Sequence, residues 1–311
     1  MVDNCSSLEA VFDVEGTNVN VDLEELNVDD GHVELLPKLG ELRLIGLPKL
    51  RHICNCGSSR NHFPSSMASA PVGNIIFPKL FHIFLKSLPN LTSFVSPGYH
   101  SLQRLHHADL DTPFPVLFDE RVAFPSLNSL TIRGLDNVKK IWPNQIPQDS
   151  FSKLEDVKVL SCGQLLNIFP SCMLKRLQRL MVDYCSSLEA VFDVEGTNVN
   201  VDLEELNVDD GHVELLPKLK ELRLFGLPKL RHICNCGSST NHFPSSMASA
   251  PVGNIIFPKL SDIILVSLPN LTSFVSPGYH SLQRLHHADL DTPSRCSLMK
   301  GSVYLSESSS F

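Results

Sequence analysis

Residues 217–233 read PKLKELRLFGLPKLRHI, and this stretch decides the fold class of the chain. Its apolar residues follow one another at spacings of three, two, three, three and three positions. The step of two places Leu222 and Leu224 on the same face of a short strand, because side chains alternate between the two faces. The flanking steps of three fit a chain that bends away at both ends. We therefore expect a short strand with one apolar face.

The same LxxLxLxx pattern recurs along the chain. Clear copies begin at Leu39, Leu80, Leu127, Leu154, Leu177, Leu219 and Leu260, and weaker ones at Leu23, Leu102 and Leu203. This is the leucine-rich-repeat signature, in which one unit cannot bury its apolar edge alone and needs stacked neighbours. The pattern predicts a leucine-rich-repeat solenoid of the α/β horseshoe type. We expect short parallel strands on its concave face, and irregular loops and short helical turns on its convex face.

A long internal duplication organises the array. Residues 1–113 align without gaps to residues 181–293, and only eight of the 113 positions differ. We expect the array to cover residues 1–293, with repeats in 114–180 joining the two copies. The stretch 54–74 and its copy 234–254 are rich in Ser, Pro, Gly and Asn and predict long convex-side loops. The Ser-rich segment 294–311 leaves the pattern and is expected to be a disordered tail.

Charge and composition exclude several classes of function. The net charge of -8 disfavours nucleic acid or an anionic membrane as the main partner. The nine cysteines lack the spacing of a secreted disulfide framework. The N-terminal sequence MVDNCSSLEA has no features of a signal peptide, and no run of about 18 apolar residues could span a membrane. A reducing, cytoplasmic setting is therefore expected.

Two groups of His, Cys and Asp residues resemble metal sites, but neither is expected to bind a metal. Zinc sites usually contain CxxC pairs, whereas the first group has a CxC pair in an expected loop, so free thiols are favoured. Adjacent histidines on a strand point apart, so the second group favours a surface turn. The first group is His52, Cys54, Cys56 and His62, with its copy His232, Cys234, Cys236 and His242. The second is His106, His107, Asp109 and Asp111, with a copy that begins at His286.

The sequence contains no catalytic motif, so we expect neither an enzyme nor a cofactor. Three cysteines follow strand motifs at a position where we expect them to turn inward and pack as small apolar residues. These are Cys5, Cys162 and Cys185. Asn90 and Asn270 begin formal glycosylation sequons, which should stay bare without a signal peptide.

Three segments carry a resemblance to a known family. They read FPSLNSLTIRGLDNVKKIW, FSKLEDVKVLSCGQLLNIFP and LKRLQRLMVDYCSSLEAVF, and two of them end a strand motif in Cys162 and Cys185. They resemble the C-terminal leucine-rich repeats of plant intracellular immune receptors of the coiled-coil, nucleotide-binding type. The resemblance covers roughly residues 1–293. It implies a sensing and autoinhibitory arm alone, because the chain has neither a GxxxxGK(S/T) phosphate loop nor a coiled coil.

The differences between the two copies point to a surface. Seven of the eight fall in the strand windows 1–4, 39–46 and 80–87, and none changes a motif leucine or isoleucine. Core positions resist change, because losing a buried leucine costs about 2–5 kcal/mol. Free drift should also have marked the long loops, yet only Arg60/Thr240 differs there. The pattern therefore favours diversification of a contact surface. The seven pairs are Asn4/Tyr184, Gly40/Lys220, Ile45/Phe225, Phe81/Ser261, His82/Asp262, Phe84/Ile264 and Lys86/Val266.

We therefore predict a protein-recognition arm in plant intracellular immunity, which binds a pathogen effector or a guarded host protein through its concave face. Two alternatives stay open: a generic adaptor such as the substrate-recognition arm of a ubiquitin ligase, and a truncated receptor fragment without independent function. The expected contact residues are Glu41, Arg43, Ile45, His82, Phe84, Lys86, Ser129, Thr131, Arg133, Asp156, Lys158, Arg179, Met181, Asp183, Glu221, Arg223, Phe225, Asp262, Ile264 and Val266. Aromatic and Arg anchors dominate such surfaces, which puts Phe84, Phe225, Arg43 and Arg223 first.

Overall fold

The structure is a computed structural model that forms two compact units, Met1–Leu154 and Glu155–Phe311. The first copy of the duplicated block lies in the first unit and the second copy in the second unit. The residues that the structure describes are 1–13, 33–55, 75–96, 116–119, 122–143, 146, 150–170, 173, 176–193, 208–209, 212–214, 216–235, 255–256, 259–275 and 302–306.

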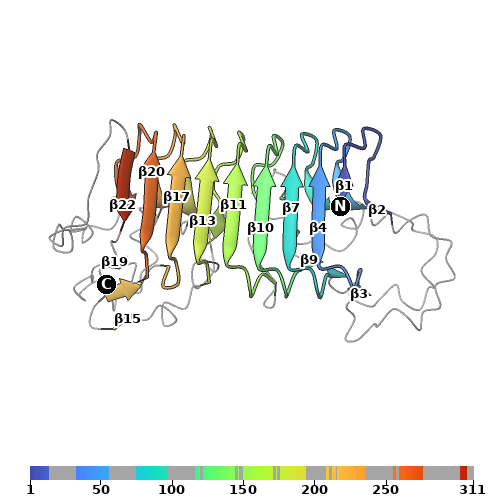
Figure 1. Ribbon diagram of the computed structural model, residues 1–311, viewed down its shortest axis with the longest axis horizontal. Coiled ribbons are helices and arrows are strands. Elements are labelled where there is room, and N and C mark those ends of the chain that lie inside the picture. Colours follow the sequence, from blue (N-terminus) through green and yellow to red (C-terminus); the bar gives the residue numbers. More distant parts are fainter. Residues whose placement is uncertain are drawn as a thin grey trace, which may run out of the picture. The chain divides into compact units, whose positions relative to one another are not determined.

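Each unit contains a parallel sheet built from the strands that the leucine motifs predict (Figure 1). In the first unit these principal strands are β1 (Val2–Asp3), β4 (Glu41–Ile45), β7 (His82–Lys86) and β10 (Ser129–Arg133). In the second they are β11 (Asp156–Leu160), β13 (Arg179–Asp183), β17 (Glu221–Phe225) and β20 (Asp262–Val266). Every strand except β1 begins two residues after the first leucine of a clear motif. The predicted leucine-rich-repeat solenoid is confirmed.

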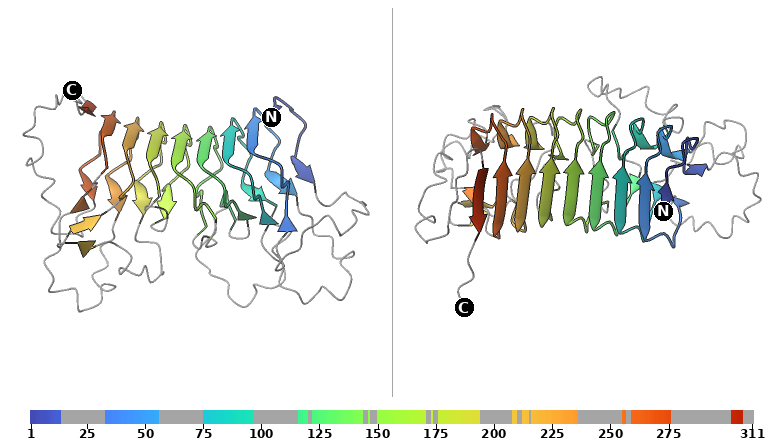
Figure 2. Two further views of the ribbon diagram at one scale, coloured as in Figure 1. Left: turned by 60° about the horizontal axis from the view of Figure 1, so that its bottom comes forward. Right: turned by 45° about the horizontal axis from the view of Figure 1, so that its top comes forward.

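Further short strands run along the other sides of the coils (Figure 2). In the first unit, one parallel sheet contains β2 (Phe12–Asp13), β5 (His52–Asn55) and β8 (Ser93–Val95), and another contains β3 (Val33–Glu34), β6 (Ile75–Ile76) and β9 (Val122–Ala123). In the second unit, one sheet contains β12 (Phe169–Pro170), β14 (Ala190–Asp193), β18 (His232–Asn235) and β21 (Ser273–Val275). Another contains β15 (Val208–Asp209), β16 (His212–Glu214) and β19 (Ile255–Ile256), with β15 antiparallel to β16.

These strands occupy places where we expected irregular loops and helical turns. Every named element in the described ranges is a strand. Cys54 and Asn55, where we expected a loop to begin, belong to β5, and residues 56–74 lie outside the described ranges. The reason is that Ile53 and Cys54 are buried while their backbone pairs with the next coil, which favours an extended chain. In the segment 294–311, the structure describes one strand, β22 (Ser302–Ser306), antiparallel to β20.

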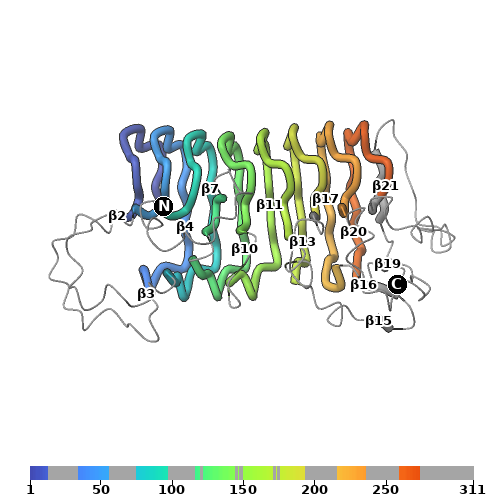
Figure 3. Tube along the Cα trace, turned by 180° about the vertical axis from the view of Figure 1, so that it is seen from behind, coloured from blue at the N-terminus to red at the C-terminus, as the bar shows by residue number. Residues whose placement is uncertain are grey.

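The core is a stack of leucines supplied by successive coils, whose path is visible in Figure 3. On β17, Leu222 and Leu224 point inward and are about fully buried. Leu227, Leu230 and Ile233 follow at spacings of three and are buried as well. The unusual rhythm of the motif therefore records one turn of the coil, in which each apolar residue points to the same interior.

The residue directly after every principal strand has a left-handed backbone conformation. Asn4, Gly46, Ser87, Gly134, Ser161, Tyr184, Gly226 and Ser267 all have φ between 50° and 62°. Within each unit, wherever another principal strand follows, the amide of this residue donates to the last carbonyl of that strand, as Gly226 does to Val266 at 3.0 Å. The turn thus extends the sheet ladder by one bond. Glycine suits such a position best, since other residues adopt a positive φ at a cost.

The first unit has a second core feature, an aromatic cluster. Phe124 stacks on Phe77 with ring centroids 5.3 Å apart, and it meets the edge of Phe94 at 5.1 Å. Phe118 and Phe151 extend the cluster to Trp142, the single tryptophan of the chain. All these rings are buried.

Among the described parts of the chain, no helix has the length and apolar character needed to cross a membrane.

Candidate functional site

The candidate site is the outer side of each principal sheet, which we call the open face. It consists of the first, third and fifth residues of the principal strands, because the second and fourth residues point into the core. All twenty residues expected from the sequence occupy such positions. Most are half-buried or exposed, whereas Thr131 is buried. The structure thus places the predicted residues on one side of each sheet, and their role in binding stays a prediction.

One member of the open face was missed in the sequence. Leu160 is the fifth residue of β11 and is half-buried, while Val157 and Val159 of the same strand are buried. A leucine in a leucine-rich motif looks like a core residue. Strict alternation from Val157 and Val159 is the signal that assigns Leu160 to the open face.

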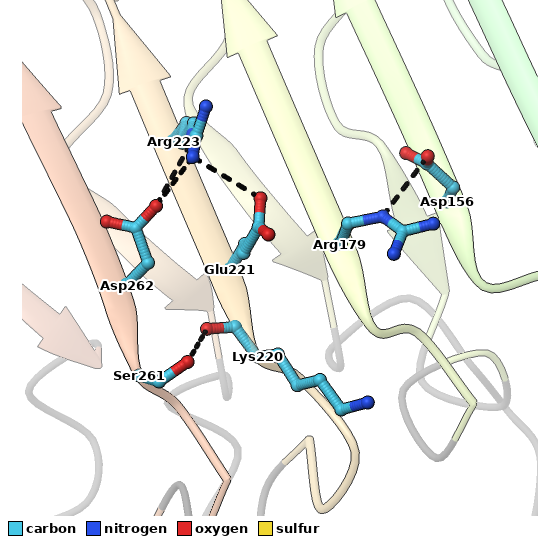
Figure 4. Close-up of polar contacts among 7 residues, drawn as sticks. All are labelled: Asp156, Arg179, Lys220, Glu221, Arg223, Ser261 and Asp262. Carbon is cyan, nitrogen blue, oxygen red and sulfur yellow. Dashed lines mark hydrogen bonds and ion pairs between the residues drawn. The ribbon is translucent and has the colours of Figure 1, made fainter. Parts of the chain in front are cut away.

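Ion pairs cross the strands of the second unit (Figure 4). Arg223 on β17 donates to the Oδ2 atom of Asp262 on β20, from Nη2 at 2.7 Å and from Nε at 3.2 Å. Its Nη2 atom also lies 3.5 Å from Oε2 of Glu221. The hydrogen bond to Asp262 raises the pKa of Arg223, and burial opposes this shift. Arg179 makes a similar contact with Asp156 at 3.3 Å.

In the first unit, the arginine that corresponds to Arg223 has a different acidic partner. Arg43 pairs with Glu41 of its own strand at 3.2 Å, because His82 stands where the second copy has Asp262. His82 faces Glu41 in register, and its Nε2 atom is shielded from solvent without a hydrogen-bond partner in the described part of the chain. One exchange between the copies therefore adds or removes an ion pair between adjacent coils.

A second exchange involves two positions that touch. A Cβ atom added to Gly40 would lie 2.7 Å from Cε1 of Phe81 on the next coil, so the ring packs over the glycine. In the second copy, Lys220 replaces Gly40 and Ser261 replaces Phe81. The Ser261 hydroxyl donates to the Lys220 carbonyl at 3.2 Å, and the lysine side chain is exposed (Figure 4). The two differences compensate each other.

This contact predicts a thermodynamic coupling. Gly40→Lys should lower the free energy of unfolding by about 1 kcal/mol, because the new side chain displaces a Phe81 ring that is free to swing toward solvent. Gly40→Lys combined with Phe81→Ser should recover most of that loss, with a coupling energy of about 0.5–1 kcal/mol. Urea unfolding of the two single variants and the double variant measures this. Additive effects would show that the exchanges are independent.

A third exchange alters the end of the open face. Ile45 faces Lys86 across β4 and β7, whereas Phe225 faces Val266 across β17 and β20. The exposed Tyr184 ring is a further aromatic side chain in this region. It covers the Gly226 backbone, because a Cβ atom added to Gly226 would lie 2.7 Å from Cδ1 of Tyr184. The first copy is thus part cationic here and the second is apolar.

The other candidate groups have structural partners or lie outside the described residues. Ser93 donates to the Val95 carbonyl at 2.6 Å, so the Nδ1–H of His52 donates to Ser93 at 2.8 Å. This serine is therefore not activated as a nucleophile. Cys54 and its copy Cys234 are buried. His232 contacts Ser273 at 2.8 Å, as His52 contacts Ser93. The rest of the first metal-like group, the whole second group, and Leu23, Leu102 and Leu203 of the weak repeats lie outside the described residues.

The cysteines that follow the strands pack as expected in two of three places. The Cys162 and Cys185 side chains are buried and donate weakly to carbonyls two residues earlier, at 3.5 and 3.6 Å. A hydrogen bond with Cys162, followed by burial, raises the pKa of Cys185 far above its ordinary value. This thiol is a poor nucleophile and metal ligand. Cys5 is exposed, contrary to the expected inward packing, because it follows β1 at the outer edge of its sheet.

The asparagines of the two sequons are also engaged. Nδ2 of Asn90 donates to the Pro48 carbonyl at 2.6 Å, and Nδ2 of Asn270 donates to the Pro228 carbonyl at 2.5 Å. These bonds tie adjacent coils together. Because Nδ2 is the atom that a glycan would modify, they work against modification in the folded chain.

The paired histidines give a pH prediction. Burial, with a smaller contribution from the adjacent Arg51 or Arg231, lowers the pKa of His52 and of His232. Stability from these groups is fully present above about pH 6.5 and declines below it, because the unfolded chain then binds protons more readily than the folded chain. His52→Gln combined with His232→Gln should therefore reduce the loss of unfolding free energy between pH 7.5 and 5.5. Urea titrations at both pH values test this, and an unchanged loss would contradict it.

The described geometry defines a leucine-rich-repeat protein. The model of the family "Plant disease resistance protein RPS2-like, leucine-rich repeats" matches residues 1–65 and 126–245, more than half of the chain. The chain therefore belongs to this family of plant disease-resistance leucine-rich repeats. Comparison with curated proteins and with solved structures gave no match.

Proposed function

We propose that this chain is a recognition arm in plant intracellular immunity, which binds a pathogen effector or a guarded host protein through the open face. The family membership supports a role in disease resistance, and leucine-rich repeats are a protein-interaction class. The proposal describes a binding function in the cytoplasm, without catalysis.

The differences between the two copies carry the proposal. Seven of eight change the strand windows, and four of these occupy open-face positions in the two copies. Replacing the touching pair Gly40 and Phe81 by Lys220 and Ser261 keeps the two positions in contact and changes the chemistry of the exposed side chains. Drift would leave such neighbours matched only by chance, whereas diversification of a surface on a retained scaffold favours compensated pairs.

The proposal is tested by capturing partners with the full chain. The bait is exposed to extracts of infected and uninfected plant tissue, and bound proteins are identified by mass spectrometry. One variant combines Arg43→Ser, Phe84→Ser, Arg223→Ser and Phe225→Ser, which removes the expected anchors. A control variant combines Lys229→Ser and Arg231→Ser, two exposed positions outside the principal strands.

The expected result is a protein captured by the original chain and by the control, and lost by the open-face variant. Thermal unfolding of both variants confirms that they remain folded. Equal capture by all three chains would place recognition elsewhere and contradict the proposal.

A further inference from the structure

Two cations lie side by side on the open face of the first unit. Lys86 and Arg133 are the fifth residues of β7 and β10 and face each other in register. Adjacent strands lie about 4.8 Å apart, and like charges at facing positions repel each other. Neither residue belongs to any ion pair of the described chain. In the same row, Ile45 separates them from the acidic Asp3.

The arginines elsewhere on the open face have acidic neighbours. Arg43 pairs with Glu41, Arg179 with Asp156, and Arg223 with Asp262. Lys158 is exposed and without an ion pair among the described residues, but it faces Met181 rather than a second cation. The doubled positive charge is thus a local departure from a surface that otherwise neutralises its arginines.

The row beside the two cations is different in character. Phe84 faces Thr131 across the same two strands and is half-buried, so it presents part of an aromatic ring next to the charges. The second copy replaces Phe84 by Ile264 and Lys86 by Val266. It also carries Asp262 in place of His82, so the corresponding face has lost a positive charge and gained a negative one. Of the two copies, only the first carries the cation and the aromatic ring at these positions.

We propose that Lys86, Arg133 and Phe84 form a docking site for an acidic segment of a partner protein, with neighbouring Asp or Glu residues beside an apolar side chain. A carboxylate between the two cations relieves their repulsion, and a guanidinium can bind it through two parallel hydrogen bonds. The apolar side chain packs against the Phe84 ring. This inference rests on the proposed recognition function and names the chemistry of its partner.

The charge distribution favours a protein segment over the other anionic partners. Nucleic acids and anionic membranes need an extended basic surface, because their binding free energy is the sum of many weak charge contacts. Here two cations stand on a chain of net charge -8. One or two carboxylates match that number.

The experiment uses the full chain and a short fluorescein-labelled peptide in which glutamates flank a phenylalanine. Binding is followed by fluorescence anisotropy at low and moderate salt. Lys86→Val, which introduces the residue of the second copy, should weaken binding about tenfold through the loss of one charge-assisted contact, and Arg133→Ser should act similarly. Lys86→Arg should retain binding. Lys49→Val removes an exposed cation of the same unit outside the principal strands and should leave binding unchanged.

Several results would overturn the inference. Equal weakening by Lys86→Val and Lys49→Val would reveal general electrostatic attraction. Equal binding of a peptide with glutamine in place of glutamate would remove the role of charge. Tighter, Lys86-dependent binding of single-stranded DNA or phosphatidylserine vesicles would assign the site to another class of partner.

The outcome separates this inference from the proposed function. If a captured partner depends on Arg223 and Phe225 but not on Lys86, recognition stands and the acidic docking site fails. If the glutamate peptide binds in a Lys86-dependent way while no partner depends on the open face, the docking chemistry stands and the proposed function fails.

Discussion

Phe124→Ala is expected to lower the free energy of unfolding of the first unit by about 3–5 kcal/mol. Phe124 is fully buried and contacts the rings of Phe77, Phe94, Phe118 and Phe151. These aromatic neighbours form a rigid set of edge-to-face and stacked contacts, so the cavity left by the missing ring cannot collapse easily. The effect should approach the upper part of that range.

Trp142 reports this effect directly. It is the single tryptophan of the chain, and its ring centroid lies 5.3 Å from that of Phe118 and 4.7 Å from that of Phe151. Its fluorescence therefore follows the unfolding of the cluster. Phe81→Ala is the matched control, because that ring is 46% exposed on the same unit. It should cost about 1 kcal/mol or less. Equal losses for the two variants would contradict the assignment of the cluster as a core.

Leu224→Ala should have the second-largest effect, about 2–5 kcal/mol, in the second unit. Leu224 is the fourth residue of β17 and is fully buried, and Leu265 of β20 lies beside it in register. The side chain is enclosed by the stacked coils, so its removal leaves apolar atoms without partners.

A leucine on the opposite side of the sheet provides the control. Leu160 points to the open face and is half-buried, so Leu160→Ala should cost about 1 kcal/mol or less. Circular dichroism during urea unfolding measures both variants. A larger loss for Leu160 than for Leu224 would mean that the sides of the sheet are assigned wrongly.

The sequence was sufficient for the principal strands, for a physical reason. Leu222 and Leu224 must both reach the core, which requires strand alternation at that point and fixes which residues point outward. The short strands such as His52–Asn55 were not predicted, because a run of four residues carries too little alternation to be recognised. Their extended form comes from pairing with the next coil.

Contacts on the candidate site were beyond sequence reasoning, because they join residues far apart in the chain. Arg223 and Asp262 are 39 positions apart, and only the strand register makes them neighbours. The same holds for Gly40 with Phe81 and for Lys86 with Arg133. The irregular lengths of the intervening segments prevent such pairs from being read by a fixed repeat period.

The most direct test of the central claim is photo-crosslinking from single positions to the captured partner. A benzophenone amino acid is placed at Phe84 or Phe225 on the open face, and at Leu166, an exposed position outside the principal strands, as the control. Recognition through the open face predicts crosslinks from Phe84, Phe225 or both, and none from Leu166. Crosslinks from Leu166 alone, with a partner that binds normally, would contradict that account.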